Sequence, residues 1–87
     1  MTETHEIRLK RLAMRSMRRG IKEMDLILSR YAEERLPQMS TAELDRYEAL
    51  LSENDQDLYQ WVSGQAPAPV ALQAIVADIA KSAYAGK

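Results

Sequence analysis

The segment Arg18-Arg19-Gly20-Ile21-Lys22-Glu23-Met24-Asp25 gathers charged side chains around a glycine. Arg19 and Glu23 are four residues apart, so they can form an ion pair on one face if a helix has begun by then. Glu23 and Asp25 diverge on a helix, while Gly20 leaves room for the backbone of another molecule to approach. Two interpretations stay open: a helix junction with a local ion pair worth about 0.2–0.5 kcal/mol, and a contact surface for a partner.

Side chains that could catalyse a reaction or hold a metal are few. His5 is the single histidine, no carboxylate is placed to orient it, and the chain has no cysteine, so we expect no nucleophile–base pair. The acidic run 53–57 could suggest a calcium loop, but a loop starting at Asp55 needs glycine at its sixth position and glutamate at its twelfth. Those positions hold Gln60 and Ala66. We therefore expect no catalytic residue, no metal site and no cofactor-binding site. We interpret these carboxylates as helix caps and favourable charge at a helix N-terminus, with Asn54 or Asp55 as the cap of the fourth helix.

Charge is distributed unevenly along the chain. Residues 1–23 contain seven Lys or Arg and three Glu, whereas residues 24–63 contain nine Asp or Glu and three Arg. This polarity suits oriented docking on a charged partner, although a solvated surface is the ordinary interpretation of such runs. A nucleic-acid-binding or toxin-neutralising (antitoxin-like) module that uses the basic first helix is an alternative. The net charge of −1 and the lack of aromatic residues among the basic ones argue against nucleic acid.

Helix-forming residues dominate and no alternating strand pattern occurs. We predict five helices, over about residues 5–17, 21–35, 41–52, 55–64 and 69–84. Gly20 is expected to end or bend the first helix, Pro37 to stop the second, and Ser40 with Glu43 to form a capping box at the start of the third. The sequence thus predicts an all-α fold, a small single-domain bundle of about five short helices that spans residues 1–87 with a core of about 5–84.

The apolar residues of each predicted helix recur on one face and should form the core. Trp61 is expected in that core, between Leu58 and Val62. The other expected core positions are Ile7, Leu9, Leu12, Met17, Ile21, Met24, Leu28, Tyr31, Leu44, Tyr47, Leu51, Leu72, Ile75, Val76 and Ile79.

No stretch of the sequence approaches the roughly 20 apolar residues that cross a membrane. The N-terminal sequence is charged from the start and resembles neither a secretory signal nor a transit peptide. We therefore expect a cytoplasmic protein without direct membrane insertion, monomeric when free.

Two blocks of the chain together match a family pattern. The run Arg-Arg-Gly-x-x-Glu-x-Asp is complete, and a second block follows as Leu-Leu, Asp-x-Asp-Leu-x-x-Trp and Gly at residues 50–64. Over about residues 7–64 the chain resembles the SdhE family of small succinate dehydrogenase assembly factors, which has a mitochondrial counterpart. Tyr31 and Tyr47 depart from the family, where Phe is frequent at these positions.

This resemblance implies a non-enzymatic factor that binds the flavoprotein subunit of succinate dehydrogenase, or of fumarate reductase, and promotes its covalent flavinylation with FAD. It implies no cofactor of its own, and direct binding of FAD stays open. The implied partner-binding residues are Arg19, Gly20 and Glu23 at the centre, with Arg18 and Asp25 in support.

Overall fold

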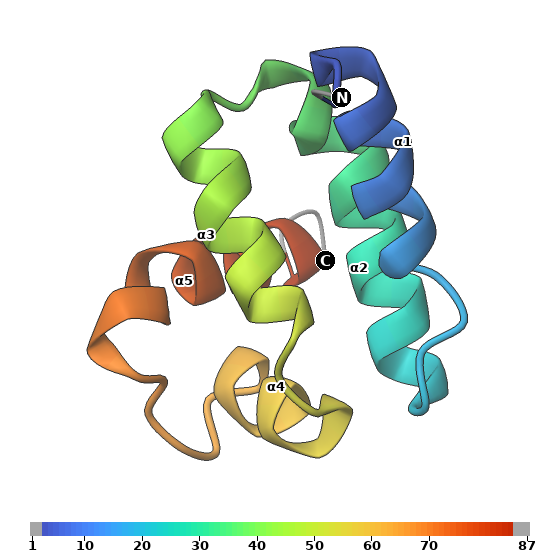
Figure 1. Cartoon of the computed structure of the whole chain (residues 1–87). Helices are drawn as coiled ribbons and strands as arrows, with labels where there is room; N and C mark the ends of the chain where they lie inside the picture. The colour runs from blue at the N-terminus through green and yellow to red at the C-terminus, as the bar shows by residue number, and fades with distance from the viewer. Residues whose placement is uncertain (1–2, 85–87) are drawn as a thin grey trace.

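The computed structural model describes residues 3–84 and folds them into five α-helices and two short 3₁₀ helices (Figure 1). None of these residues lies in a β-strand, so the prediction of an all-α fold is confirmed. The α-helices are α1 (His5–Arg15), α2 (Lys22–Arg35), α3 (Thr41–Leu51), α4 (Asp55–Val62) and α5 (Gln73–Tyr84), and the 3₁₀ helices are η1 (Leu36–Gln38) and η2 (Val70–Leu72).

The start of α3 follows the predicted capping chemistry, whereas the end of α1 does not follow the prediction. The Ser40 hydroxyl accepts from the Glu43 N–H at 3.2 Å, and the Glu43 carboxylate accepts from the Ser40 N–H at 3.0 Å, which is the predicted capping box. Helix α1 stops at Arg15, two residues earlier than predicted. Gly20 neither ends nor bends it, because the left-handed residue of the connection is Arg18, with φ 56°.

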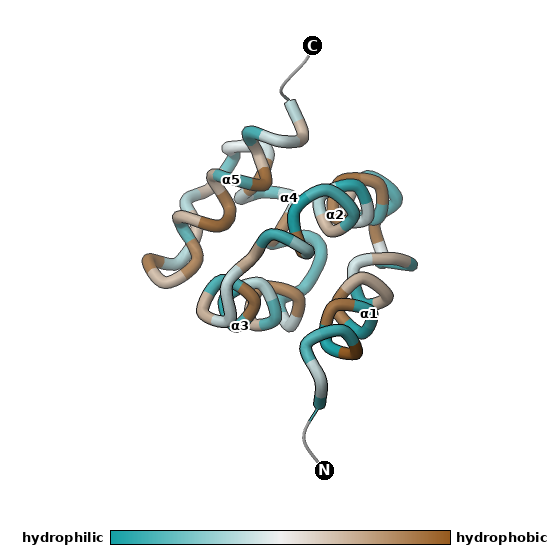
Figure 2. Tube along the Cα trace, turned by 90° about the horizontal axis from the view of Figure 1, so that it is seen from above, coloured by the Kyte–Doolittle hydropathy of each residue, from teal (hydrophilic) through white to brown (hydrophobic). Residues whose placement is uncertain are grey.

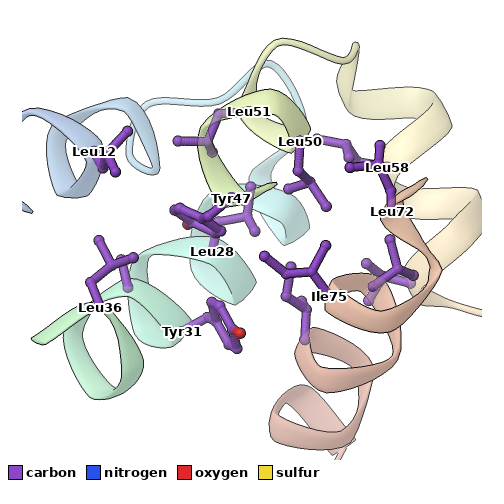
Figure 3. Close-up of a cluster of buried hydrophobic side chains, with 14 of the residues drawn as sticks. Leu12, Leu28, Tyr31, Leu36, Tyr47, Leu50, Leu51, Leu58, Leu72 and Ile75 are labelled. Carbon is purple, nitrogen blue, oxygen red and sulfur yellow. The ribbon is translucent and has the colours of Figure 1, made fainter. Parts of the chain in front are cut away.

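The core is one cluster to which every α-helix contributes (Figure 3). The predicted core faces of α2, α3 and α5 are confirmed. Helix α1 buries Leu12 fully but leaves Ile7 55% exposed, and Met17, which follows the end of α1, is 51% exposed, so the predicted face of the first helix was wrong at these two positions. Trp61 is also not a core residue: it is partly buried at the margin, while Leu58 and Val62 enter the cluster. In a domain this small, much of the surface of each outer helix remains exposed to solvent. This limits how many side chains of α1 and α4 can enter the core.

Two buried tyrosines keep their hydroxyl groups hydrogen-bonded. The Tyr31 hydroxyl donates to Asp78 at 2.6 Å, and the Tyr47 hydroxyl shares a hydrogen bond with Ser16, which also donates to the Leu12 carbonyl at 2.8 Å. Burial raises the pKa of Tyr47 to about 12. Since a buried polar group needs a partner, these contacts explain how tyrosine occupies two core positions. The Ser16–Tyr47 contact also fastens the end of α1 to α3.

The arrangement of the helices determines where the charged segment lies. Viewed from above, α1 lies beside α2 and α3, and α5 lies on the opposite side of the bundle from α1 (Figure 2). The α1–α2 connection turns at the end of the bundle that α4 occupies (Figure 1). Residues 19–21 therefore contact α4, although they lie far from it in sequence.

Candidate functional site

The connection between α1 and α2 is held by one carboxylate from α4. Oδ1 of Asp55 accepts from Nε of Arg19 at 2.8 Å and lies 2.8 Å from its Nη2. Oδ2 of the same side chain accepts from the backbone N–H of Gly20 and, at 3.2 Å, from that of Ile21. A charged acceptor that binds a guanidinium and two successive N–H groups is well satisfied, because charge-assisted hydrogen bonds are the strong ones.

Arg19 joins the ends of three helices. Besides Asp55, its guanidinium donates to the carbonyls of Arg15 at 3.1 Å, Leu51 at 3.3 Å and Glu53 at 3.3 Å. Terminal carbonyls of a helix have no partner within the helix, and a cation there also interacts favourably with the helix dipole. The side chain of Arg19 is accordingly only 12% exposed, as is that of Asp55.

Arg19 therefore forms no ion pair with Glu23, and the interpretation of the segment as a helix junction with that ion pair is wrong. Helix α2 begins at Lys22, so Arg19 precedes the helix and does not lie one turn before Glu23 on a helical face. Glu23 is exposed on the first turn of α2. It lies beside Tyr59 of α4, and hydrogen bonding to the Glu23 carboxylate raises the pKa of the Tyr59 phenol.

The remaining residues of the motif differ in exposure. Arg18 and Gly20 are exposed, whereas Asp25 is partly buried and accepts from the Ser29 hydroxyl at 3.1 Å. The φ of Gly20 is not positive, but a Cβ atom built there would lie 3.2 Å from Oδ2 of Asp55. Glycine is thus favoured at position 20 by close approach to a carboxylate rather than by a left-handed backbone.

A shallow hollow of about 450 Å³ adjoins the motif. It is open to solvent, so it suits contact with another protein better than enclosure of a small molecule. Its lining residues are Arg15, Met17, Arg18, Arg19, Gly20, Glu53, Asn54 and Asp55.

The basic first helix faces acidic residues of α3. Arg8 binds Asp45 at 2.6 Å and Glu48 at 3.1 Å, and Arg11 binds Glu48 at 2.9 Å. The Arg11 hydrogen bond and the neighbouring Arg8 hold the pKa of Glu48 below its usual value. The charge asymmetry seen along the sequence is therefore largely neutralised within the fold. This weakens the nucleic-acid alternative, because binding to phosphates needs cations that are not already paired.

Asp55 is the residue whose role the sequence analysis missed. Of the two caps that the sequence left open, Asn54 is the N-cap of α4, and its side chain accepts from the Asp57 N–H at 2.8 Å. With Asn54 available as a cap, a further carboxylate at position 55 was free for another partner. That redundancy was the signal in the sequence, although it did not identify Arg19 as the partner.

Neither a metal site nor a membrane-spanning helix occurs in the described part of the chain. Within residues 3–84, no three or more His, Asp and Glu side chains are grouped so as to hold a metal ion. Over the same residues, no helix combines the length and the apolar character needed to cross a membrane.

The fold places the chain among small helical-bundle proteins, and comparison with known proteins defines the family. The family model described as flavinator of succinate dehydrogenase matches residues 10–83. The chain therefore belongs to this family, which confirms the resemblance found in its sequence.

Several curated relatives are named "Succinate dehydrogenase assembly factor 2, mitochondrial". The protein of Scheffersomyces stipitis is 49% identical over 61 residues, which cover 70% of this chain and 41% of the relative. The protein of Komagataella phaffii is 46% identical over 59 residues (68% and 31%), and that of Schizosaccharomyces pombe 40% identical over 67 residues (77% and 48%). The chain thus matches less than half the length of each of these relatives.

The expectation of a cytoplasmic location is contradicted by these comparisons. The relatives are named as mitochondrial proteins, which points to the mitochondrion rather than the cytoplasm. The expectation depended on finding no targeting pattern in the N-terminal sequence, and the lack of such a pattern does not determine a compartment.

Proposed function

We propose that this protein, acting as a single domain over residues 1–87 and monomeric when free, is an assembly factor for the flavoprotein subunit of succinate dehydrogenase. It binds that subunit, or the related subunit of fumarate reductase, and promotes covalent attachment of FAD. The observation that carries the proposal is the complete motif at residues 18–25 of a family member. Arg18 and Gly20 are exposed on a connection that Asp55 holds, and Glu23 is exposed on the first turn of α2.

The chemistry of flavin attachment belongs to the partner in this proposal. The attacking histidine and the flavin are parts of the flavoprotein, and the factor acts by binding most tightly the conformation in which attack occurs. Orientation alone can accelerate a reaction strongly. A binding protein shifts a conformational equilibrium only as far as its affinities for the two conformations differ.

Glu23 is the residue of the motif best placed to contribute binding energy. Its carboxylate is exposed in the free protein, so its removal should change the free energy of unfolding by only a few tenths of a kcal/mol. In a complex the same carboxylate would lose its water and pair with a donor of the flavoprotein. Removing it there should cost about 2–5 kcal/mol, in large part because that donor stays buried and unpaired.

A comparison of two glutamates on α2 tests the proposal. Glu23→Ala should abolish or strongly reduce covalent flavin on the flavoprotein in a strain that lacks the native factor, and weaken binding of the purified flavoprotein subunit. Glu33→Ala is the matched control, since Glu33 is also an exposed carboxylate of α2, ten residues away from the motif's Glu23. Parental flavinylation and affinity with a folded Glu23→Ala variant would refute the proposed surface.

A further inference from the structure

The motif contains two kinds of residue that its sequence does not distinguish. Arg18 and Glu23 are exposed, whereas Arg19 is 12% exposed and already has hydrogen-bonding partners on α1, α3 and α4. To contact a partner directly, the Arg19 guanidinium would have to abandon Asp55 and three carbonyl groups. Arg19 therefore connects the helix ends from inside the fold.

Asp55 acts on the backbone of the motif as well as on Arg19. It accepts from the N–H groups of Gly20 and Ile21, the two residues directly before α2. These contacts set the backbone at the point where α2 starts, and thereby the direction in which the first turn of α2 presents Glu23. The left-handed φ of Arg18 occurs in the same connection, directly before Arg19 and Gly20.

We propose that Asp55 is a positioning residue of the partner-binding surface, holding residues 18–21 so that Arg18 and Glu23 face the flavoprotein while Arg19 remains inside as its counter-charge. This inference depends on the proposed function, since it assigns roles within the same surface. It makes α4 part of the site, although no residue of α4 belongs to the motif.

A second residue of α4 supports this role of the helix. Tyr59 lies one turn after Asp55, and residues four apart share a face of a helix. The Tyr59 phenol lies beside the Glu23 carboxylate. Since α2 and α4 also pack against one another, this face of α4 lies near the motif on both sides of the start of α2.

Two neighbouring aspartates provide a matched test. Asp55→Asn and Asp57→Asn each remove one negative charge from the first turn of α4, so they weaken its favourable interaction with the helix N-terminus to a similar degree. Of these two aspartates, only Asp55 accepts hydrogen bonds from residues 19–21. We expect Asp55→Asn to weaken binding of the flavoprotein subunit at least tenfold and Asp57→Asn less than twofold. Amide hydrogen exchange at Gly20 and Ile21 should accelerate at least tenfold in the first variant and remain parental in the second.

A double-mutant cycle separates an internal role of Arg19 from a direct contact. If Arg19 acts through Asp55, Arg19→Ala should weaken binding at least tenfold in the parent but less than twofold further in an Asp55→Ala background, since coupled residues are not additive. The same loss in both backgrounds would mean that Arg19 touches the partner, which would overturn the inference.

A conservative substitution covers the case in which the Asp55 variants do not fold. Arg19→Lys keeps a cation opposite Asp55, so amide protection at Gly20 and affinity for the flavoprotein should fall together in Arg19→Ala and recover together in Arg19→Lys. Lost binding with parental protection at Gly20 would overturn the positioning role.

The outcome for the parent distinguishes the two proposals. If the parent protein does not bind the flavoprotein subunit, the proposed function is wrong, and the positioning role of Asp55 is then wrong as well. If the parent binds, Glu23→Ala does not, and Asp55→Asn binds like the parent, only the role of Asp55 is refuted.

Discussion

Replacing Gly20 by alanine should destabilise the protein through one contact with Asp55. The new Cβ would lie 3.2 Å from Oδ2, so the carboxylate must move by a few tenths of an ångström. Arg19 holds that carboxylate at 2.8 Å, and each hydrogen bond to a charged group contributes about 1.5–3 kcal/mol. Partial loss of these bonds outweighs the gain of about 0.4–1 kcal/mol from a less flexible unfolded chain. We expect a net loss of about 1 kcal/mol.

The sign of this effect should reverse when the carboxylate is absent. In an Asp55→Ala background a Cβ at position 20 no longer meets Oδ2, the one close neighbour that it has in the parent. Gly20→Ala should then stabilise the protein by about 0.4–1 kcal/mol. Urea unfolding of the parent, the two single variants and the double variant measures the difference in the free energy of unfolding. A change of about 1 kcal/mol corresponds to about 4–8 °C in melting temperature for a domain of this size.

Gly64 provides the control. It has φ 85° and no atom within 4 Å of a Cβ built there, so Gly64→Ala should cost about 1–2 kcal/mol by backbone strain alone, equally in both backgrounds. An identical cost of Gly20→Ala with and without the Asp55 carboxylate would refute the reasoning.

Two further predictions concern the core and the charged edge. Leu58→Ala should lower the free energy of unfolding by about 2–5 kcal/mol because that side chain is fully buried. Trp61→Ala should lower it less because the indole is only partly buried. A larger loss at Trp61 in chemical unfolding would contradict this packing. The free energy of unfolding should fall as the pH decreases below about 4.5, because Arg11 and Arg8 lower the pKa of Glu48 and the unfolded chain then binds more protons than the native one. Glu48→Gln should flatten this acid limb, and an unchanged pH profile would show that the ion pairs with α1 contribute nothing.

Features that depend on neighbouring residues could be predicted well from the sequence. The Ser40–Glu43 capping box and the core face of α2 with Met24 and Leu28 are confirmed, because capping and helical periodicity involve residues three or four positions apart. Trp61 shows the limit of such reasoning. Periodicity places it near a core face, but only the packing of neighbouring helices determines how far the ring is covered.

The sequence by itself determined the all-α class, the helix order and the resemblance to the family. Only the tertiary structure decided which residues the motif contacts within the fold. Arg19 meets Asp55, 36 positions away, rather than Glu23, because α2 starts only at Lys22 and the ends of α1, α3 and α4 converge beside the connection. Ion pairs across such a distance depend on how helices pack, and packing is a property of the assembled core that no short stretch of residues contains.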